Sequence, residues 1–225
     1  ARGGDDALLL DLHGERRNVE LRFGSLSPAL ARKIPDVFVD LVEIAAYVYC
    51  ADQATTRGGD GALDMGARWR RRFRFSIPVR RPELWSQDAV TNELERTLGL
   101  LSDDEFTFDF VSLTPSQENE SGMLRYLDLD AAEPEGPPTK ADEVVLFSGG
   151  LDSFAGAAQE SLRDDQTIVL LSHRTSPRVE PHQRKLVEAL RARSKKPIVH
   201  VPVWLQKDAR LGREHTQRTR SFLYA

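Results

Sequence analysis

Cysteine is almost absent from this sequence, which has one, Cys50, among 225 residues. No internal disulfide can form, and no zinc site can be built from several cysteines, so a reducing compartment is expected. Long apolar runs are missing as well, since none approaches the roughly 18 residues of a membrane-spanning helix. The N-terminal residues also lack the basic-then-apolar order of a secretory signal. We therefore expect a soluble, cytoplasmic protein with no membrane contact.

A strong excess of either charge is also missing, with 31 Lys and Arg against 35 Asp and Glu and a formal net charge of -4. Such a composition has no general attraction to nucleic acid or acidic membranes. Contact with nucleic acid would depend on a local patch, and the sequence leaves it undecided. Hydrophobic residues make up 40% of the chain, which is long enough for one large domain or two ordinary ones.

Proline, glycine and charge replace periodic apolar residues at 133–141, which predicts a linker. We expect an N-terminal α+β accessory domain at residues 1–132 and a second domain at residues 142–225. Apolar spacing and alternation predict two helices and two strands in the first domain. They are helices at 35–51 and 82–101 and strands at 69–79 and 106–113.

Arginines alternate with aromatic residues at 69–79, whereas phenylalanines alternate with polar and acidic residues at 105–110. Arginine beside aromatic rings could serve nucleic-acid binding, because arginine neutralises phosphate and rings stack on bases. Alternation, however, places the rings and the arginines on opposite faces of a strand. We favour a structural interpretation, in which the rings are core and the arginines pair across the sheet with Glu105 and Asp109.

The second domain has a different pattern, with short apolar runs at 143–147, 167–171 and 198–203. Runs that are apolar on both faces are typical of parallel strands covered by helices. Helical patterns at 152–162 and 179–193 separate these runs. The alternation of strand and helix predicts right-handed crossovers and an α/β fold with a doubly wound parallel sheet.

The loop after the first of these strands carries most of the polar chemistry. In an open α/β sheet, ligands bind where strands end at their carboxyl edge. Glycines allow a sharp turn with inward N–H groups, and the following helix adds its positive end, so phosphate is the expected ligand. Asp152 is placed to hold Mg²⁺ or to cap the helix. The alternative interpretation of the loop is that its glycines only make a tight turn from strand to helix. The loop residues are Ser148, Gly149, Gly150, Leu151, Asp152 and Ser153.

Other phosphate and nucleophile motifs do not occur here. The sequence lacks the Walker motif, and no Gly-x-Gly-x-x-Gly follows a predicted strand. The nucleophile elbow Gly-x-Ser-x-Gly is absent around these serines. The histidines, including His173 just after the second predicted strand of this domain, show no paired metal spacing.

Residues 144–156, reading VVLFSGGLDSFAG, resemble the signature of the PP-loop (N-type) ATP pyrophosphatases. Within that family the chain resembles the 7-cyano-7-deazaguanine synthases of the queuosine pathway. The long N-terminal part and residues 216–221, reading TQRTRS, further resemble the synthase-like components of bacterial antiphage systems of the Qat and type IV CBASS kinds.

The resemblance implies ATP and Mg²⁺ as cofactors, with the loop at 148–153 on the phosphates and Asp152 on the metal. It implies that Asp152, Ser153 and Arg220 are catalytic, and that Arg218 is a second phosphate- or substrate-binding arginine. For both arginines, the alternative is a solvated charge on a helix. The ends of the next two strands would frame the adenine, with Leu171, Ser172, His173 and Val201.

The resemblance also implies an activity, that of a ligase forming a carbon–nitrogen bond through an acyl-adenylate. The expected substrate is a small carboxylate similar to 7-carboxy-7-deazaguanine. The alternatives are a non-catalytic nucleotide-binding module of a defence complex and an enzyme that modifies a protein or nucleic acid through the adenylate. The synthases' cysteine-rich zinc site has no counterpart here, so zinc could be held only by residues outside this chain.

The chain ends inside a helical pattern at 221–225, which suggests a fragment that lacks part of the catalytic domain. The first domain, for its part, contains no acids, bases or nucleophiles that assemble into a site from sequence alone. We predict that it binds a protein partner or mediates subunit assembly through an open strand edge.

Overall fold

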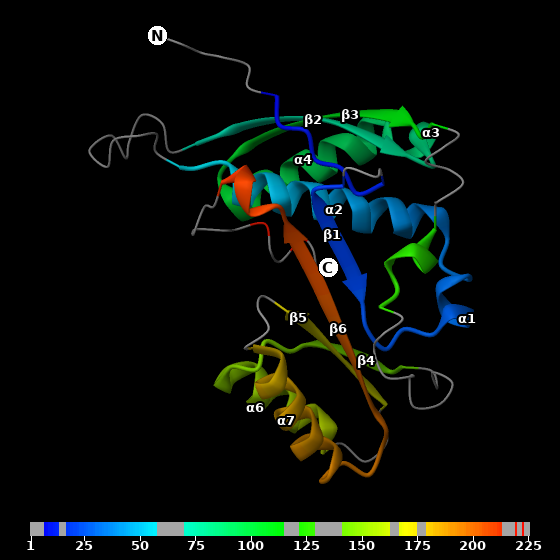
Figure 1. Ribbon diagram of the computed structural model, residues 1–225, viewed down its shortest axis with the longest axis vertical. Coiled ribbons are helices and arrows are strands. Elements are labelled where there is room, and N and C mark those ends of the chain that lie inside the picture. Colours follow the sequence, from blue (N-terminus) through cyan, green and yellow to red (C-terminus); the bar gives the residue numbers. More distant parts are fainter. Residues whose placement is uncertain are drawn as a thin grey trace. The chain divides into compact units, whose positions relative to one another are not determined.

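Helices and strands alternate along most of the chain in the computed structural model, and the protein is mixed α/β (Figure 1). The structure describes residues 7–13, 17–57, 70–114, 122–128, 141–162, 167–174 and 179–212, with Thr219 and Phe222. Its elements are β1 (Val19–Phe23), α1 (Pro28–Ala31), α2 (Asp36–Ala54), β2 (Arg72–Val79), α3 (Pro82–Trp85), α4 (Asp88–Ser102), β3 (Glu105–Ser112), the 3-10 helix η1 (Met123–Tyr126), β4 (Glu143–Leu146), α6 (Leu151–Ser161), β5 (Ile168–Arg174), α7 (Val179–Arg191), β6 (Ile198–Lys207) and the 3-10 helix η2 (Ala209–Leu211). Among the described residues, no helix is both long and apolar enough to cross a membrane.

The chain divides into two compact units that are not continuous in sequence. Unit 1 comprises residues 1–19, 35–122 and 207–225, and unit 2 comprises residues 20–34 and 123–206. Residues 133–140 of the predicted linker lie outside the described residues, so the predicted boundary there stays a prediction.

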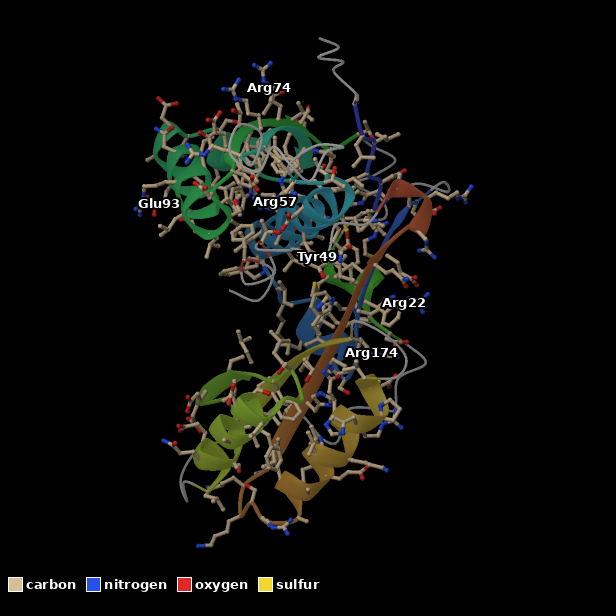
Figure 2. The ribbon with its side chains drawn as sticks, turned by 90° about the vertical axis from the view of Figure 1, so that its left-hand side faces the viewer. Arg22, Tyr49, Arg57, Arg74, Glu93 and Arg174 are labelled. Atoms are coloured by element: carbon tan, nitrogen blue, oxygen red, sulfur yellow. The ribbon has the colours of Figure 1, made fainter. Side chains whose placement is uncertain are left out.

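Unit 1 contains a parallel pair of strands, β2 and β3, joined through α3 and α4. The expected pairing of a basic with an acidic strand is confirmed at Arg72, which lies opposite Glu105 and donates a 2.8 Å hydrogen bond to it. Asp109 is opposite Ser76 rather than an arginine. On the other face the phenylalanines of β3 are buried as predicted, whereas Arg74 points outward (Figure 2).

The helix predicted at 82–101 forms as two helices, α3 and α4, with a break at Ser86 and Gln87. Trp85 is buried at this break, and its Nε1 donates to Asp40 of α2 at 3.1 Å. Thr91 Oγ1 donates to the carbonyl oxygen of Trp85 at 2.7 Å. The break therefore places an indole ring against α2, which apolar periodicity alone does not reveal.

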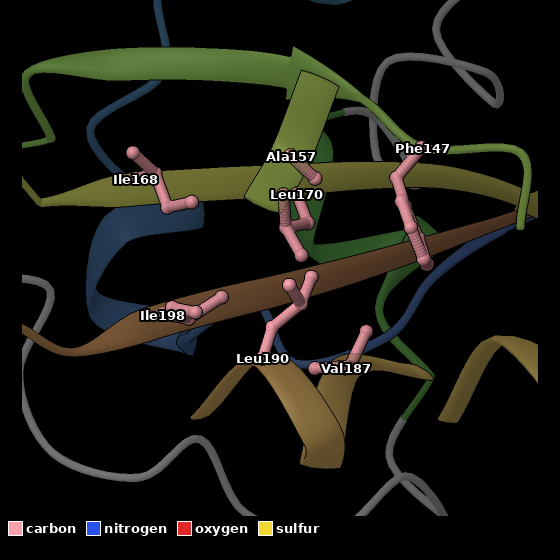
Figure 3. Packing of buried hydrophobic residues seen from close by; sticks show 7 residues of the cluster. All are labelled: Phe147, Ala157, Ile168, Leu170, Val187, Leu190 and Ile198. Atoms are coloured by element: carbon pink, nitrogen blue, oxygen red, sulfur yellow. The ribbon is translucent and has the colours of Figure 1, made fainter. Parts of the chain in front are cut away.

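Unit 2 is built on a four-stranded sheet in the order β1-β6-β5-β4. The predicted parallel arrangement of β4, β5 and β6 is confirmed, while β1 was not predicted. Both α6 and α7 supply side chains to one apolar cluster on one face of these strands (Figure 3). On the opposite face of β4, Val144 and Leu146 are 61% and 50% exposed. A doubly wound sheet, with helices on both faces, stays a prediction.

Candidate functional site

The predicted phosphate loop follows β4 at the carboxyl edge of the parallel strands. Phe147 fixes its start, because the ring is buried in the apolar cluster and the backbone N–H donates to the carbonyl oxygen of Leu171 at 2.8 Å. Gly149 then has φ of +83°, in the left-handed region that glycine adopts without a steric penalty. Helix α6 begins two residues later, so the loop turns directly from a strand end to a helix N-terminus.

Two hydroxyl groups lie together across this turn. The Oγ atoms of Ser148 and Ser153 are 3.0 Å apart, and Ser153 Oγ also donates to the carbonyl oxygen of Gly150 at 3.0 Å. Gly150, the N-cap residue of α6, has no side chain that could cap the first turn of the helix. Two hydroxyls thus lie at the positive N-terminal end of α6, an arrangement suited to an anion.

Asp152 is exposed in the first turn of α6. Among the residues that the structure describes, no group of three or more His, Cys, Asp or Glu could hold a metal ion. Mg²⁺ at phosphate sites keeps several waters and uses one or two carboxylates together with phosphate oxygens. A single exposed carboxylate beside the predicted phosphate loop is therefore compatible with magnesium. Leu151 is 83% exposed, so its contribution to an anion site would come from its backbone.

Two side chains of helix α7 contact the backbone of the loop, and neither contact was predicted from the sequence. Gln183 Nε2 donates to the carbonyl oxygen of Ser148 at 3.1 Å and to that of His173 at 3.3 Å. His182 Nε2 lies 3.2 Å from the carbonyl oxygen of Gly149, which can only accept. One signal could have found Gln183, because it precedes Val187 and Leu190 on the buried stripe of α7 at a four- and a seven-residue spacing.

The predicted adenine-framing residues divide between the two faces of the sheet. Leu171 and Val201 are half-buried register partners on the face opposite the apolar cluster, next to Leu146. Ser172 instead points into the interior, where it is fully buried and lies 2.9 Å from His200 Nε2. His173 contributes its backbone carbonyl to the contact with Gln183.

Burial, together with the nearby positive charge of Arg191, lowers the pKa of His200 to about 4. The imidazole is therefore neutral at physiological pH. Its partner Ser172 has no exposed surface, so this pair is a hydrogen-bonded part of the core and not an accessible nucleophile.

Arg218 and Arg220, the predicted substrate arginines, lie outside the described residues, and so does His215. Thr219 between the two arginines is described and is 1% exposed. Its backbone N–H and its Oγ1 both donate to Asp52 Oδ2, at 3.1 and 2.8 Å. The one described residue of the predicted substrate segment is therefore bonded to α2, in unit 1.

Unit 1 also contains two buried charged clusters that the sequence did not reveal. In the first, Arg80 donates to Asp40 and Glu43 of α2 at 2.9 and 2.8 Å, and His13 Nε2 is 3.3 Å from Glu43. Burial alone would raise the pKa of Glu43, but hydrogen bonds from His13 and Arg80 lower it to about 2.

The second cluster connects the other end of α2 to β2 and β3. Arg71 donates to Asp52 and to Asp104, both at 2.6 Å. Arg57 makes two hydrogen bonds to the same Asp104 carboxylate, at 3.0 and 2.7 Å. Each carboxylate in the two clusters is hydrogen-bonded to an arginine. The clusters therefore connect α2 to the ends of the strands and are structural, not reactive, groups.

Comparison of the chain with protein-family models, with curated proteins and with solved structures gave no match. The resemblance to the PP-loop family therefore rests on the motif residues themselves.

Proposed function

We propose that this chain binds ATP with Mg²⁺ at residues 148–153 and activates a carboxylate as an acyl-adenylate, releasing pyrophosphate. The proposal includes membership of the PP-loop ATP pyrophosphatases and their doubly wound sheet. One observation carries it: a glycine turn after a parallel strand leads into a helix whose N-cap has no side chain, beside two hydroxyls and an exposed aspartate. This set of groups suits a triphosphate and magnesium.

In the proposed reaction, the loop N–H groups and the hydroxyls of Ser148 and Ser153 bind phosphate oxygens. Asp152 would hold Mg²⁺, which would neutralise the charge that builds up on the departing pyrophosphate. A substrate carboxylate oxygen attacks the α-phosphate, and the bond to pyrophosphate breaks. Arg220 would orient the carboxylate or a phosphate with its fixed fork of donors. A nitrogen nucleophile then displaces AMP from the acyl-adenylate.

The substrate class follows from the resemblance to the 7-cyano-7-deazaguanine synthases, and it is a small carboxylate such as 7-carboxy-7-deazaguanine. By the same resemblance the activity belongs to bacterial antiviral defence. The nucleophile would be ammonia, or an amine of a protein or nucleic acid.

The proposal is tested by measuring pyrophosphate released from Mg-ATP by the full chain, with and without 7-carboxy-7-deazaguanine. Asp152→Asn should keep the fold and lose the release, because a carboxamide is a poor magnesium ligand. Glu188→Gln, a matched change at an exposed position of α7, should have no effect. Turnover by Asp152→Asn equal to that of the unchanged protein would refute the magnesium role. Binding of ATP without any release would favour a nucleotide-binding module of a defence complex.

A protein partner of unit 1 is also proposed, and the edge of β2 supports it. The carbonyls of Arg71 and Val79 accept from β3, so the alternate residues 72, 74, 76 and 78 direct their backbone groups to the other edge. Pro78, which has no N–H, occupies one of these outward positions, as is usual in an edge strand. Arg74→Pro should therefore leave the fold intact and weaken any association through this edge, measured by light scattering or partner capture. Unchanged association would exclude the edge as the contact.

A further inference from the structure

The backbone carbonyls of the phosphate loop are held from one side by α7. Gln183 bonds the carbonyl oxygen of Ser148 at 3.1 Å, and His182 bonds that of Gly149 at 3.2 Å. These two carbonyls belong to the peptide groups whose nitrogens are those of Gly149 and Gly150. Two consecutive peptide planes of the loop are thus fixed by side chains of a single helix.

Peptide planarity determines what this contact does to the donors. In a trans peptide the N–H points opposite to the C=O, and no cis peptide occurs among the described residues. Holding both carbonyls toward α7 therefore turns the N–H groups of Gly149 and Gly150 away from it. In agreement, the N–H of Gly150 donates to Ser148 Oγ at 3.2 Å, on the hydroxyl side of the loop. Helix α7 selects the side on which the loop presents its donors.

The position of Gln183 shows that the contact is not incidental. The residue is 1% exposed, although burying an amide costs free energy unless its polar atoms are bonded. Within the described part of the chain, its Oε1 atom has no hydrogen-bond partner, which adds to that cost. An apolar residue would suit the buried stripe of α7 better and would leave the carbonyls of Ser148 and His173 without their donor.

Glycine and glutamine also fit each other sterically at this point. A Cβ atom on Gly149 would stand 3.0 Å from Gln183 Cγ, at a backbone φ of +83° that other residues rarely adopt. The absence of a side chain at Gly149 therefore lets the loop lie directly on Gln183, within hydrogen-bond distance of its amide.

We infer that Gln183 is a positioning residue for phosphate, acting together with His182 by orienting the peptide groups of the loop rather than by touching the ligand. The inference rests on the proposed nucleotide site. It concerns the triphosphate portion of the ligand, since the oriented N–H groups are suited to phosphate oxygens and not to the nucleoside.

The test compares the affinities of Mg-ATP and of adenosine by calorimetry in the full chain. Gln183→Leu should weaken Mg-ATP binding at least tenfold and leave adenosine binding unchanged, because only phosphate uses the oriented N–H groups. Gln159→Leu, the same change at an exposed position of α6, should alter neither affinity. Amide hydrogen exchange of α7 and β5 reports whether the unit remains folded.

Equal Mg-ATP affinity in Gln183→Leu and the unchanged protein would overturn the inference and leave the proposed function standing. A parallel loss of ATP and adenosine binding in a folded variant would overturn it too. If Gln183→Leu does not fold, the variant His182→Phe, at an exposed position, is measured instead. We expect its affinity for Mg-ATP to fall several-fold while its affinity for adenosine is unchanged. An unchanged affinity for Mg-ATP would overturn the inference. An unchanged protein that binds Mg-ATP no better than adenosine would refute the proposed function, and the inference with it.

Discussion

The two units stabilise their interiors in different ways. Unit 1 buries eight charged or titratable side chains of its two clusters, which lie mainly along α2 and around the ends of β2. They are His13, Asp40, Glu43, Asp52, Arg57, Arg71, Arg80 and Asp104. Unit 2 has an apolar cluster between its strands and the helices α6 and α7, and several of its side-chain hydrogen bonds surround the loop after β4.

The two buried arginines of unit 1 show how a short parallel pair of strands can be fixed against a helix. Arg71 stands just before β2 and Arg80 just after it, and they bond Asp52 and Asp40 near opposite ends of α2. Two buried ion pairs fix orientation, since each must meet its partner or leave a charge unpaired. In unit 2 the apolar cluster has no charged member, and the loop after β4 is held by hydrogen bonds from α7.

The largest effect is expected from breaking a cluster of unit 1. Arg71→Met should lower the free energy of unfolding by about 3–5 kcal/mol, because Asp52 and Asp104 would stay buried without their shared arginine. Chemical denaturation measures the loss. Arg72→Met, which removes an exposed ion pair one residue away, should cost far less. Similar losses for the two variants would show that the buried cluster does not stabilise unit 1.

The second prediction concerns acid. Because the pKa of Glu43 is lowered to about 2, its contribution is complete above its ordinary value of 4.5 and is lost as the pH falls toward 2. The difference corresponds to roughly 3 kcal/mol. The protection factors of α2 amides, which correct for the intrinsic pH dependence of exchange, should therefore fall between about pH 4.5 and 2. Glu43→Gln should remove this pH dependence, and a variant that keeps it would assign the effect to other carboxyl groups.

Trimming the core of unit 2 should have a smaller effect that does not depend on pH. Ile168→Val removes one methylene from the apolar cluster, at a cost of about 1 kcal/mol. Denaturation at pH 7 and pH 6 should give the same loss, since the removed methylene is uncharged and His200, with a pKa of about 4, is neutral at both. A loss that differs between the two pH values would mean that the apolar and charged interiors are energetically coupled.

The smallest effect is expected at Thr219. Thr219→Val removes the hydroxyl that donates to Asp52, and the lost hydrogen bond is worth about 1 kcal/mol. Trypsin should therefore cleave after Arg218 and Arg220 on the order of fivefold faster. Thr219→Ser retains the hydroxyl and should be cleaved at the rate of the unchanged protein. Equal rates for the valine and serine variants would show that this bond does not hold the segment.

Much of the secondary structure was determined by the sequence alone, because apolar periodicity depends only on neighbours along the chain. It predicted α2, β2, β3 and the alternation from β4 to β6, and the glycine loop was found by its position after a strand. The loop's position at the carboxyl edge of parallel strands is as expected, while its role in nucleotide binding stays a prediction.

Tertiary structure decided which buried polar residues meet. Gln183 reaches the loop across 35 positions of sequence, and Thr219 reaches Asp52 across 167. No local pattern encodes such pairs, since their energy depends on burial and on the direction of each donor, which exist only once the helices and strands have packed. The same holds for β1, which pairs with β6 from the far end of the chain. Periodicity thus predicted most helices and strands, whereas hydrogen bonds between distant residues determined the two charged clusters of unit 1 and the contacts of Gln183 with the loop.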